Sequence, residues 1–128
     1  MNNEPVLPVG VRVTDPCVAA RPKAQVHTGV DVVLRPIDVD LDTDSLFAAG
    51  HGADQEWIWT YMPYGPFDDR AQMRAWLQES SESADPRFFT VCQQPDAKPV
   101  GMVSYLSIAA EHRSIEVGHI WYSPQVQR

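Results

Sequence analysis

Residues 98–128 read KPVGMVSYLSIAAEHRSIEVGHIWYSPQVQR, and the fold is decided in this stretch. Two runs rich in β-branched and aromatic residues, from about Val100 to Ile108 and from about Ser114 to Tyr122, flank a short polar link. This pattern is typical of two antiparallel strands joined by a short connection. Pro124 ends the second strand, because proline has no backbone N–H for a sheet ladder.

The second of these strands contains a glutamate and a glycine among apolar residues. Glycine weakens a strand interior and often marks a bulge or a close approach to the backbone. In a regular strand the side chains would alternate between two faces, with Ile115, Val117, His119 and Trp121 on one and Glu116, Gly118, Ile120 and Tyr122 on the other. A bulge between Glu116 and His119 would instead bring both to one side.

Two further strands are predicted upstream. Residues 87–93, RFFTVCQ, are apolar on both faces, which favours a central strand. The turn signal Pro95-Asp96 follows, so this strand and the next should form a hairpin. Residues 30–37, VDVVLRPI, form an apolar run that a proline ends, and they predict the first strand.

Three helices are predicted between the first two strands. Acidic residues from Asp38 onward favour the start of the first, and Gly50 ends it. The second spans residues 54–61, with Asp54 as its cap and with Trp57, Ile58 and Tyr61 on one face. Asp68 or Asp69 caps the third, whose apolar stripe is Met73, Trp76 and Leu77, and a polar link over residues 80–86 follows.

The resulting order is strand, three helices, and three strands. Helices segregated from a run of antiparallel strands predict an α+β fold. Residues 1–29 hold four of the eleven prolines and little periodicity, so we interpret them as an extended leader. The folded domain is expected over residues 30–128.

Composition limits the possible functions. A length of 128 residues indicates one domain, and a net charge of −7 argues against nucleic acid as a partner. The first ten residues lack the features of a secretory signal, and no apolar run approaches the roughly 18 residues of a membrane helix. Cys17 and Cys92 indicate neither a disulfide framework nor a metal site. We therefore expect a cytoplasmic protein without metal or membrane partner.

Two groups of motifs resemble the GNAT acetyltransferase superfamily. The runs VGMVSY and RSIEVGHIWYSP are similar to the third and fourth strands of that superfamily, especially of its RimJ/RimL-like branch, which acetylates amines. The run WTYMPYGPF at residues 59–67, followed by Trp76-Leu77, is similar to the same branch. The resemblance covers roughly residues 32–128 and implies a GNAT-like mixed, mostly antiparallel sheet with helices that ends after its fourth strand.

The resemblance implies that acetyl-CoA is the co-substrate and that an amine attacks it directly. In this family the fourth strand carries a bulge whose free backbone groups pair with the pantetheine arm, which here implies Ile120, Trp121 and Tyr122. A phosphate-binding loop follows, and Gln127 and Arg128 would be its first two positions. Arg128 stands where many members have glycine, so the loop would be atypical.

Glu116 matches the glutamate that RimJ/RimL-like sequences commonly hold in this strand, and it is the candidate general base. Apolar neighbours would raise its pKa toward neutrality, whereas pairing with Arg87 or Arg113 would give it a structural role instead. His119 is a candidate substrate-binding residue, although such a histidine is more often a satisfied core residue. Tyr122 and Ser123 could supply a proton to the leaving thiolate.

Tyr64 and Phe67 lie among turn residues and are candidates for the acceptor pocket, since the family places this segment there. Trp57 and Tyr61 could equally fill the core. Three functions remain open: the amine-acetylating part of a longer enzyme, inactive or nearly so as a 128-residue fragment; a non-catalytic α+β interaction module; and a GNAT-fold enzyme that uses another acyl donor. Binding of coenzyme A separates the first two, and neither the acceptor nor the oligomeric state follows from the sequence.

Overall fold

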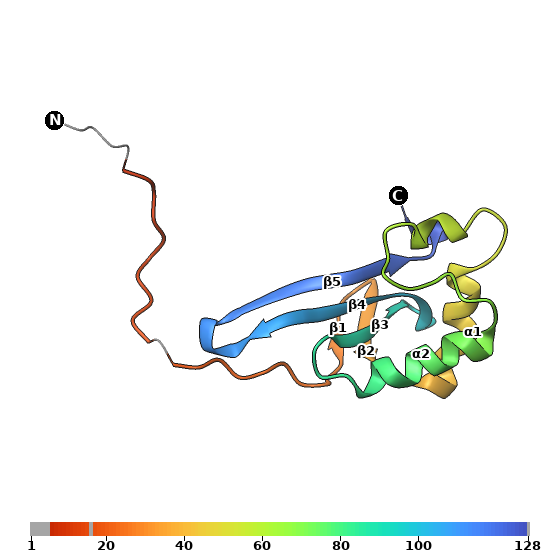
Figure 1. Cartoon of the computed structure of the whole chain (residues 1–128), viewed down its shortest axis with the longest axis horizontal. Helices are drawn as coiled ribbons and strands as arrows, with labels where there is room; N and C mark the ends of the chain where they lie inside the picture. The colour runs from red at the N-terminus through yellow and green to blue at the C-terminus, as the bar shows by residue number, and fades with distance from the viewer. Residues whose placement is uncertain (1–5, 16, 128) are drawn as a thin grey trace.

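The computed structural model describes residues 6–15 and 17–127. Its body is a five-stranded antiparallel sheet of order β1-β2-β3-β4-β5, and the two α-helices lie together on one side of it (Figure 1). This arrangement confirms the predicted α+β class. The elements in chain order are β1 His27–Thr28, β2 Val32–Pro36, α1 Val39–Gly50, η1 Glu56–Trp59, α2 Arg70–Glu82, β3 Arg87–Gln93, β4 Lys98–Ala109, η2 Ala110–His112, β5 Ser114–Tyr122 and η3 Pro124–Val126.

Both α-helices begin at aspartates, as the sequence predicts. The Asp38 side chain accepts a hydrogen bond from the backbone N–H of Leu41, and the Asp69 side chain accepts one from that of Gln72. These caps satisfy N–H groups that have no partner inside the helix. The third predicted helix runs further than expected, because α2 continues through Glu82 into the predicted link.

The predicted second helix is wrong in type and in its buried face. Residues 56–59 form a single 3₁₀ turn that begins after Gln55, and Asp54 does not cap it. Trp59 is 2% exposed, whereas Trp57 is 57% and Tyr61 98% exposed, so neither of the last two fills the core. A 3₁₀ turn has three residues per turn, so the i, i+4 spacing used for the prediction does not describe its faces.

The hydrophobic core lies between the two α-helices and the middle of the sheet. Leu46 of α1, Met73 and Leu77 of α2, and Met102 of β4 are fully buried there, and Trp121 of β5 joins them. Because Trp121 lies near the end of β5, the last strand is fixed to the helical layer by its own side chain.

A buried ion pair ties α1 to the sheet. Both terminal nitrogens of Arg35 in β2 donate to the Asp42 carboxylate of α1, at 2.9 and 2.5 Å. Thr90 of β3 donates its hydroxyl at 2.7 Å, and the backbone N–H of Asp38 donates at 3.0 Å. The hydrogen bond to Asp42 raises the pKa of Arg35, which favours the charged guanidinium.

Gly101 lets β4 and β5 approach each other closely. A Cβ at this position would lie 2.2 Å from the carbonyl oxygen of Trp121, a backbone atom that cannot swing aside. We expect Gly101→Ala to lower the free energy of unfolding by about 1–3 kcal/mol, the usual cost of overpacking. Urea denaturation measures it, with Gly10→Ala as control because a Cβ there meets nothing. Equal midpoints for the two variants would contradict the close approach.

The residues before the sheet extend along and beyond the body, as Figure 1 shows for the described part. The backbone N–H of Ala19 donates to Ala110 at 3.0 Å, and Arg113 donates to the carbonyl of Asp15 at 2.5 Å. The two-residue strand β1 lies inside the predicted leader, so the sheet begins at His27. The division at residue 29 stays a prediction.

Candidate active site

A bulge interrupts the ladder between β4 and β5. Ser104 pairs with Gly118 and Met102 pairs with Trp121, so the single residue Val103 opposes both His119 and Ile120. His119 has a φ of +51°, which a residue with a side chain rarely adopts. Such a bulge re-aims the side chains that follow it, and strained backbone is often found at functional sites.

The bulge changes which side chains share a face. Glu116 pairs with Leu106, and Leu106 is on the same face of β4 as Met102, which is the face that the helices cover. His119 and Trp121 also point to that face, since they pack on helical-layer and loop residues. The prediction that side chains alternate regularly along this strand is therefore wrong. Glu116 and His119 lie on the same side of the sheet, as predicted for a strand with a bulge between them.

Glu116 lies on the rim of this face. Its carboxylate is exposed and accepts a hydrogen bond from the Ser107 hydroxyl at 3.2 Å. The apolar enclosure expected for it is not found. Among the described residues neither Arg87 nor Arg113 forms an ion pair with it, and Arg113 contacts Asp15 instead. The carboxylate is thus accessible and only lightly engaged.

His119 belongs to an aromatic cluster of four rings, Tyr64, Trp76, Phe88 and His119. Its imidazole stacks on Tyr64, with ring centroids 5.6 Å apart and planes 13° apart, and meets the edge of Phe88 at 5.2 Å. Trp76 of α2 packs on Tyr64 at 4.3 Å and on Phe88 at 5.6 Å. The cluster joins the loop before α2, α2, β3 and β5, so it lies where the helical layer meets the bulge.

Three buried polar atoms in and beside the aromatic cluster lack a hydrogen-bond partner within the described part of the chain. They are the Tyr64 hydroxyl, Nδ1 of His119 and Nε1 of Trp121. Burial also raises the pKa of Tyr64, so its phenol stays protonated. Buried polar groups are nearly always paired in folded proteins, so these three atoms are available to polar groups from outside the described part of the chain.

The structure brings only one of the two predicted pocket aromatics to His119. Tyr64 stacks on it directly, whereas Phe67 is nearly buried in the core and packs on Trp59 and Trp76, at 5.7 and 5.6 Å. Sequence reasoning missed Phe88. It occurs in RFFTVCQ, where both faces are apolar, so alternation could not assign it to the side of the site.

The outer edge of β5 has no neighbouring strand among the described residues. Ser123 donates its backbone N–H to Val100 at 2.8 Å. Because inward and outward backbone groups alternate along an antiparallel strand, those of Trp121 face β4 and those of Tyr122 face the open edge. The Tyr122 carbonyl accepts a hydrogen bond from the Gln127 side chain at 2.8 Å, and Arg128 lies outside the described residues.

The Tyr122 side chain lies on the other face of the sheet. There it lines an apolar cavity of about 440 Å³ together with Leu34, Val91 and Val103. The structure therefore does not bring the Tyr122 phenol onto the face of Glu116, although both belong to the same strand. Ser123 is buried, and its hydroxyl accepts the N–H of Gln125 at 3.4 Å, where it caps η3.

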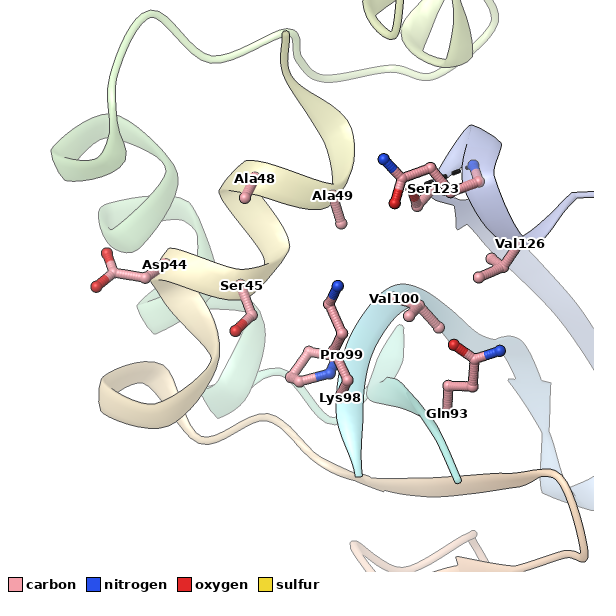
Figure 2. A pocket seen from close by; sticks show the side chains of 11 residues that line it. Asp44, Ser45, Ala48, Ala49, Gln93, Lys98, Pro99, Val100, Ser123 and Val126 are labelled. Carbon is pink, nitrogen blue, oxygen red and sulfur yellow. Dashed lines mark hydrogen bonds between the residues drawn. The ribbon is translucent and has the colours of Figure 1, made fainter. Parts of the chain in front are cut away.

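A second cavity, of about 540 Å³, lies between α1 and the end of β5. Figure 2 shows the Lys98 side chain reaching into it, with Ser45 and Ala49 of α1 on one side and Ser123 on another. Asp44 at its rim pairs with Arg70 at 3.2 Å. Lys98 was not anticipated from the sequence, where it reads as an ordinary strand-end lysine.

Membrane and metal features are not found in the part of the chain that the structure describes. Within residues 6–15 and 17–127, no helix has the length and apolarity needed to cross a bilayer. The same residues contain no group of three His, Cys, Asp or Glu side chains placed to hold a metal ion. Cys17 is exposed and unpaired, whereas Cys92 is buried, and burial raises the pKa of its thiol.

Comparison with solved structures gives relatives with the same fold. A GCN5-related N-acetyltransferase from Brucella melitensis is 30% identical with a TM-score of 0.81, over 86% of this chain and 50% of that one. An acetyltransferase of the GNAT family from Chromobacterium violaceum is 27% identical with a TM-score of 0.79, over 98% and 63%. One from Bacillus anthracis shares the fold at 17% identity, with a TM-score of 0.61 over 79% and 55%.

The chain thus spans half to just under two thirds of the length of the first two structures. No curated protein matches it. Residues 31–128, well over half of the chain, match the family model described as Acetyltransferase (GNAT) domain. The bulge in β5, which is the fourth long strand, and the two helices on one face of the sheet are consistent with this match. The chain therefore belongs to the GNAT acetyltransferase family.

Proposed function

We propose that the chain forms the amine-binding part of a RimJ/RimL-like N-acetyltransferase, which moves an acetyl group from acetyl-CoA to a primary amine. The observation that carries this proposal is the bulge at His119, which places Glu116 and His119 on one face beside the open edge of β5. The family membership supports acyl transfer in general, and the motifs around residues 59–67 and 113–124 support the amine-acetylating branch.

In the proposed reaction the acyl donor lies along the outer edge of β5, with its amide groups pairing with backbone groups near Ile120 and Tyr122. The acceptor nitrogen attacks the thioester carbonyl, so the C–N bond forms and the C–S bond breaks. Glu116, directly or through a water, takes the proton from the amine. The leaving thiolate takes its proton from solvent at the open edge, because the Tyr122 phenol lies over the other face of the sheet.

The aromatic cluster is proposed as the floor of the acceptor site. Within the described residues the Tyr64 hydroxyl and His119 Nδ1 of this cluster have no hydrogen-bond partner, and they can bind polar groups of an acceptor. Phe67 and Trp59 pack behind it and hold the loop in place. Gln127, whose side chain holds the Tyr122 carbonyl, and Arg128 are proposed as the beginning of the phosphate loop.

The first experiment is titration of the 128-residue chain with coenzyme A by calorimetry, together with sequencing of the gene past the codon for Arg128. We expect weak binding to this chain, turnover below detection, and strong binding with acetyl transfer by any longer product of the same frame. Because the relatives are longer than this chain, turnover is assayed on the longest product. If neither form binds coenzyme A, the proposal is wrong.

Replacement of Glu116 tests the base. We expect Glu116→Gln in the longest product to lower kcat/KM by about 10²–10⁴-fold, the usual contribution of a positioned general base. Steady-state kinetics measures the loss, and Glu111→Gln, an exposed glutamate in the η2 turn just before the same strand, should stay within twofold of the parent.

The alternative is a non-catalytic interaction module, and one observation favours it. The open edge of β5 and the apolar cavity of about 440 Å³ on the uncovered sheet face offer a surface for another polypeptide. Absence of coenzyme A binding in every form of the protein would support this alternative.

A further inference from the structure

The loop that carries Tyr64 and Phe67 is fastened to the end of α1 by one histidine. His51 immediately follows α1, and its Nδ1 lies 2.9 Å from the carbonyl oxygen of Phe47. Its other ring nitrogen, Nε2, accepts the backbone N–H of Phe67 at 2.8 Å, across sixteen residues of chain. Both ring nitrogens are therefore engaged, one with the helix and one with the far end of the loop.

These two contacts fix the protonation state of the ring. A carbonyl oxygen can only accept, so Nδ1 must carry a hydrogen and donate it. A backbone N–H can only donate, so Nε2 must be without one. The geometry therefore requires a neutral imidazole with its proton on Nδ1, and an imidazolium would place two N–H groups against each other at Phe67.

Packing holds the imidazole in this orientation. Its ring stacks on Phe47 with centroids 4.2 Å apart and planes 7° apart, and it lies 5.4 Å from Trp59 and 6.0 Å from Phe67. The neighbouring loop residue Gln55, with its amide nitrogen turned toward the helix, donates to the carbonyls of Ala48 and His51. The end of α1 thus has its carbonyls satisfied by side chains of the loop.

Charged groups near this histidine come from α1, the loop and α2. Arg70 of α2 lies over the Phe47 ring at 5.3 Å and pairs with Asp44 of α1. The loop contributes Asp54 and Glu56, and Asp68 and Asp69 precede α2. Among the described residues none of these four carboxylates forms a hydrogen bond or ion pair with His51. Protonation of the ring would therefore gain no partner and would lose the bond to Phe67.

We propose that His51 is a positioning residue: its neutral, Nδ1-protonated ring holds the loop of residues 52–67 against α1, and protonation releases the Phe67 end of that loop. The loop's role in acceptor binding rests on the proposed function, whereas its attachment by His51 does not.

Hydrogen exchange of the Phe67 amide in the 128-residue chain tests the proposal without any turnover. Protection factors, which remove the intrinsic effect of pH on exchange, are compared at a pH where the ¹⁵N spectrum of the imidazole shows a neutral ring and at a pH where it shows an imidazolium. We expect the wild-type value at Phe67 to fall at least fivefold between these two conditions, as loss of one hydrogen bond predicts. His51→Gln, whose amide can accept without titrating, should give equal protection at both.

His51→Phe separates the hydrogen bonds from the packing. It keeps a ring on Phe47, and it should show low Phe67 protection at both pH values. If it protects Phe67 as the wild type does, the ring acts by packing alone and the proposal is overturned. If that variant does not fold, the long-range ¹⁵N spectrum of the wild-type imidazole still decides the question, because a neutral ring protonated on Nε2 would overturn the proposal. Wild-type protection of Phe67 that does not change when the ring is protonated would overturn it equally.

Discussion

Asp42→Ala is expected to lower the free energy of unfolding by about 3–5 kcal/mol, because removal of one partner leaves a buried charge without compensation. Asp42 is fully buried and accepts from Arg35 twice, from Thr90 and from the N–H of Asp38. The substitution therefore leaves the guanidinium of Arg35 without its counter-ion, and it also removes the contacts that join α1 to β2 and β3. Urea denaturation followed by tryptophan fluorescence measures the loss.

Asp44→Ala is the matched control for this substitution. It lies two residues further along α1, its side chain is mostly exposed, and its pair with Arg70 should contribute about 0–1 kcal/mol. The double variant Arg35→Met, Asp42→Leu should regain much of the stability, since apolar residues of similar size often replace a buried ion pair without loss. Equal losses for Asp42→Ala and Asp44→Ala would contradict this account.

Trp59→Ala is expected to have a comparable effect, about 3–5 kcal/mol, the usual result of removing a buried aromatic side chain. The indole fills a slot between two glycines: a Cβ at Gly50 or at Gly65 would lie 2.6 Å from its ring. It also packs on Trp121 at 4.8 Å and donates its N–H to the Gly50 carbonyl at 2.8 Å. Its loss should leave a cavity and an unsatisfied carbonyl together.

Trp57→Ala provides the comparison, because it removes the same side chain two residues away from a position that is mostly exposed. We expect it to change stability by no more than about 0.5 kcal/mol. Calorimetric melting of both variants beside the parent measures the difference in midpoint. A Trp57→Ala loss as large as that of Trp59→Ala would show that the indole slot does not hold the loop.

The strands and the two long helices could be predicted because their signals are local. The bounds of β3 and β5 agree with the predicted ranges of residues 87–93 and 114–122, since runs of β-branched and aromatic residues end at turn residues there. Asp38 and Asp69 cap the helices through side-chain contacts only three residues away. Such signals need no knowledge of the rest of the fold.

Features that depend on distant parts of the chain were harder to predict. In the sequence Asp42 is one of several acidic residues that favour a helix start, and only the partners Arg35 and Thr90 make it a buried anchor. Trp57 and Trp59 look alike, and the contact with Gly50 decides which is buried. His51 showed no signal, because its partners are the backbone groups of Phe47 and Phe67, and the second lies sixteen residues away from it.

The candidate site was partly predictable. Glu116, His119 and Tyr64 lie on one side of the sheet, but His119 does so only because of the bulge. The side chains of Val103 and Ile120 give no signal in the sequence for the position of the extra residue. Phe67 was assigned to the pocket from its turn neighbours, and its packing on Trp59 places it in the core instead. The roles of these residues in catalysis stay predictions.

The bulge also means that β5 contains one residue more between Gly118 and Trp121 than β4 contains between Ser104 and Met102. If Ile120 were absent, Trp121 would follow His119 directly, would still oppose Met102 and would still point into the core, because the positions from Glu116 onward would then match the parity of β4 from Leu106 to Gly101. His119 alone would change sides and leave Tyr64 and Phe88. The extra residue is therefore spare as far as the core is concerned, and its effect is confined to aiming a single imidazole.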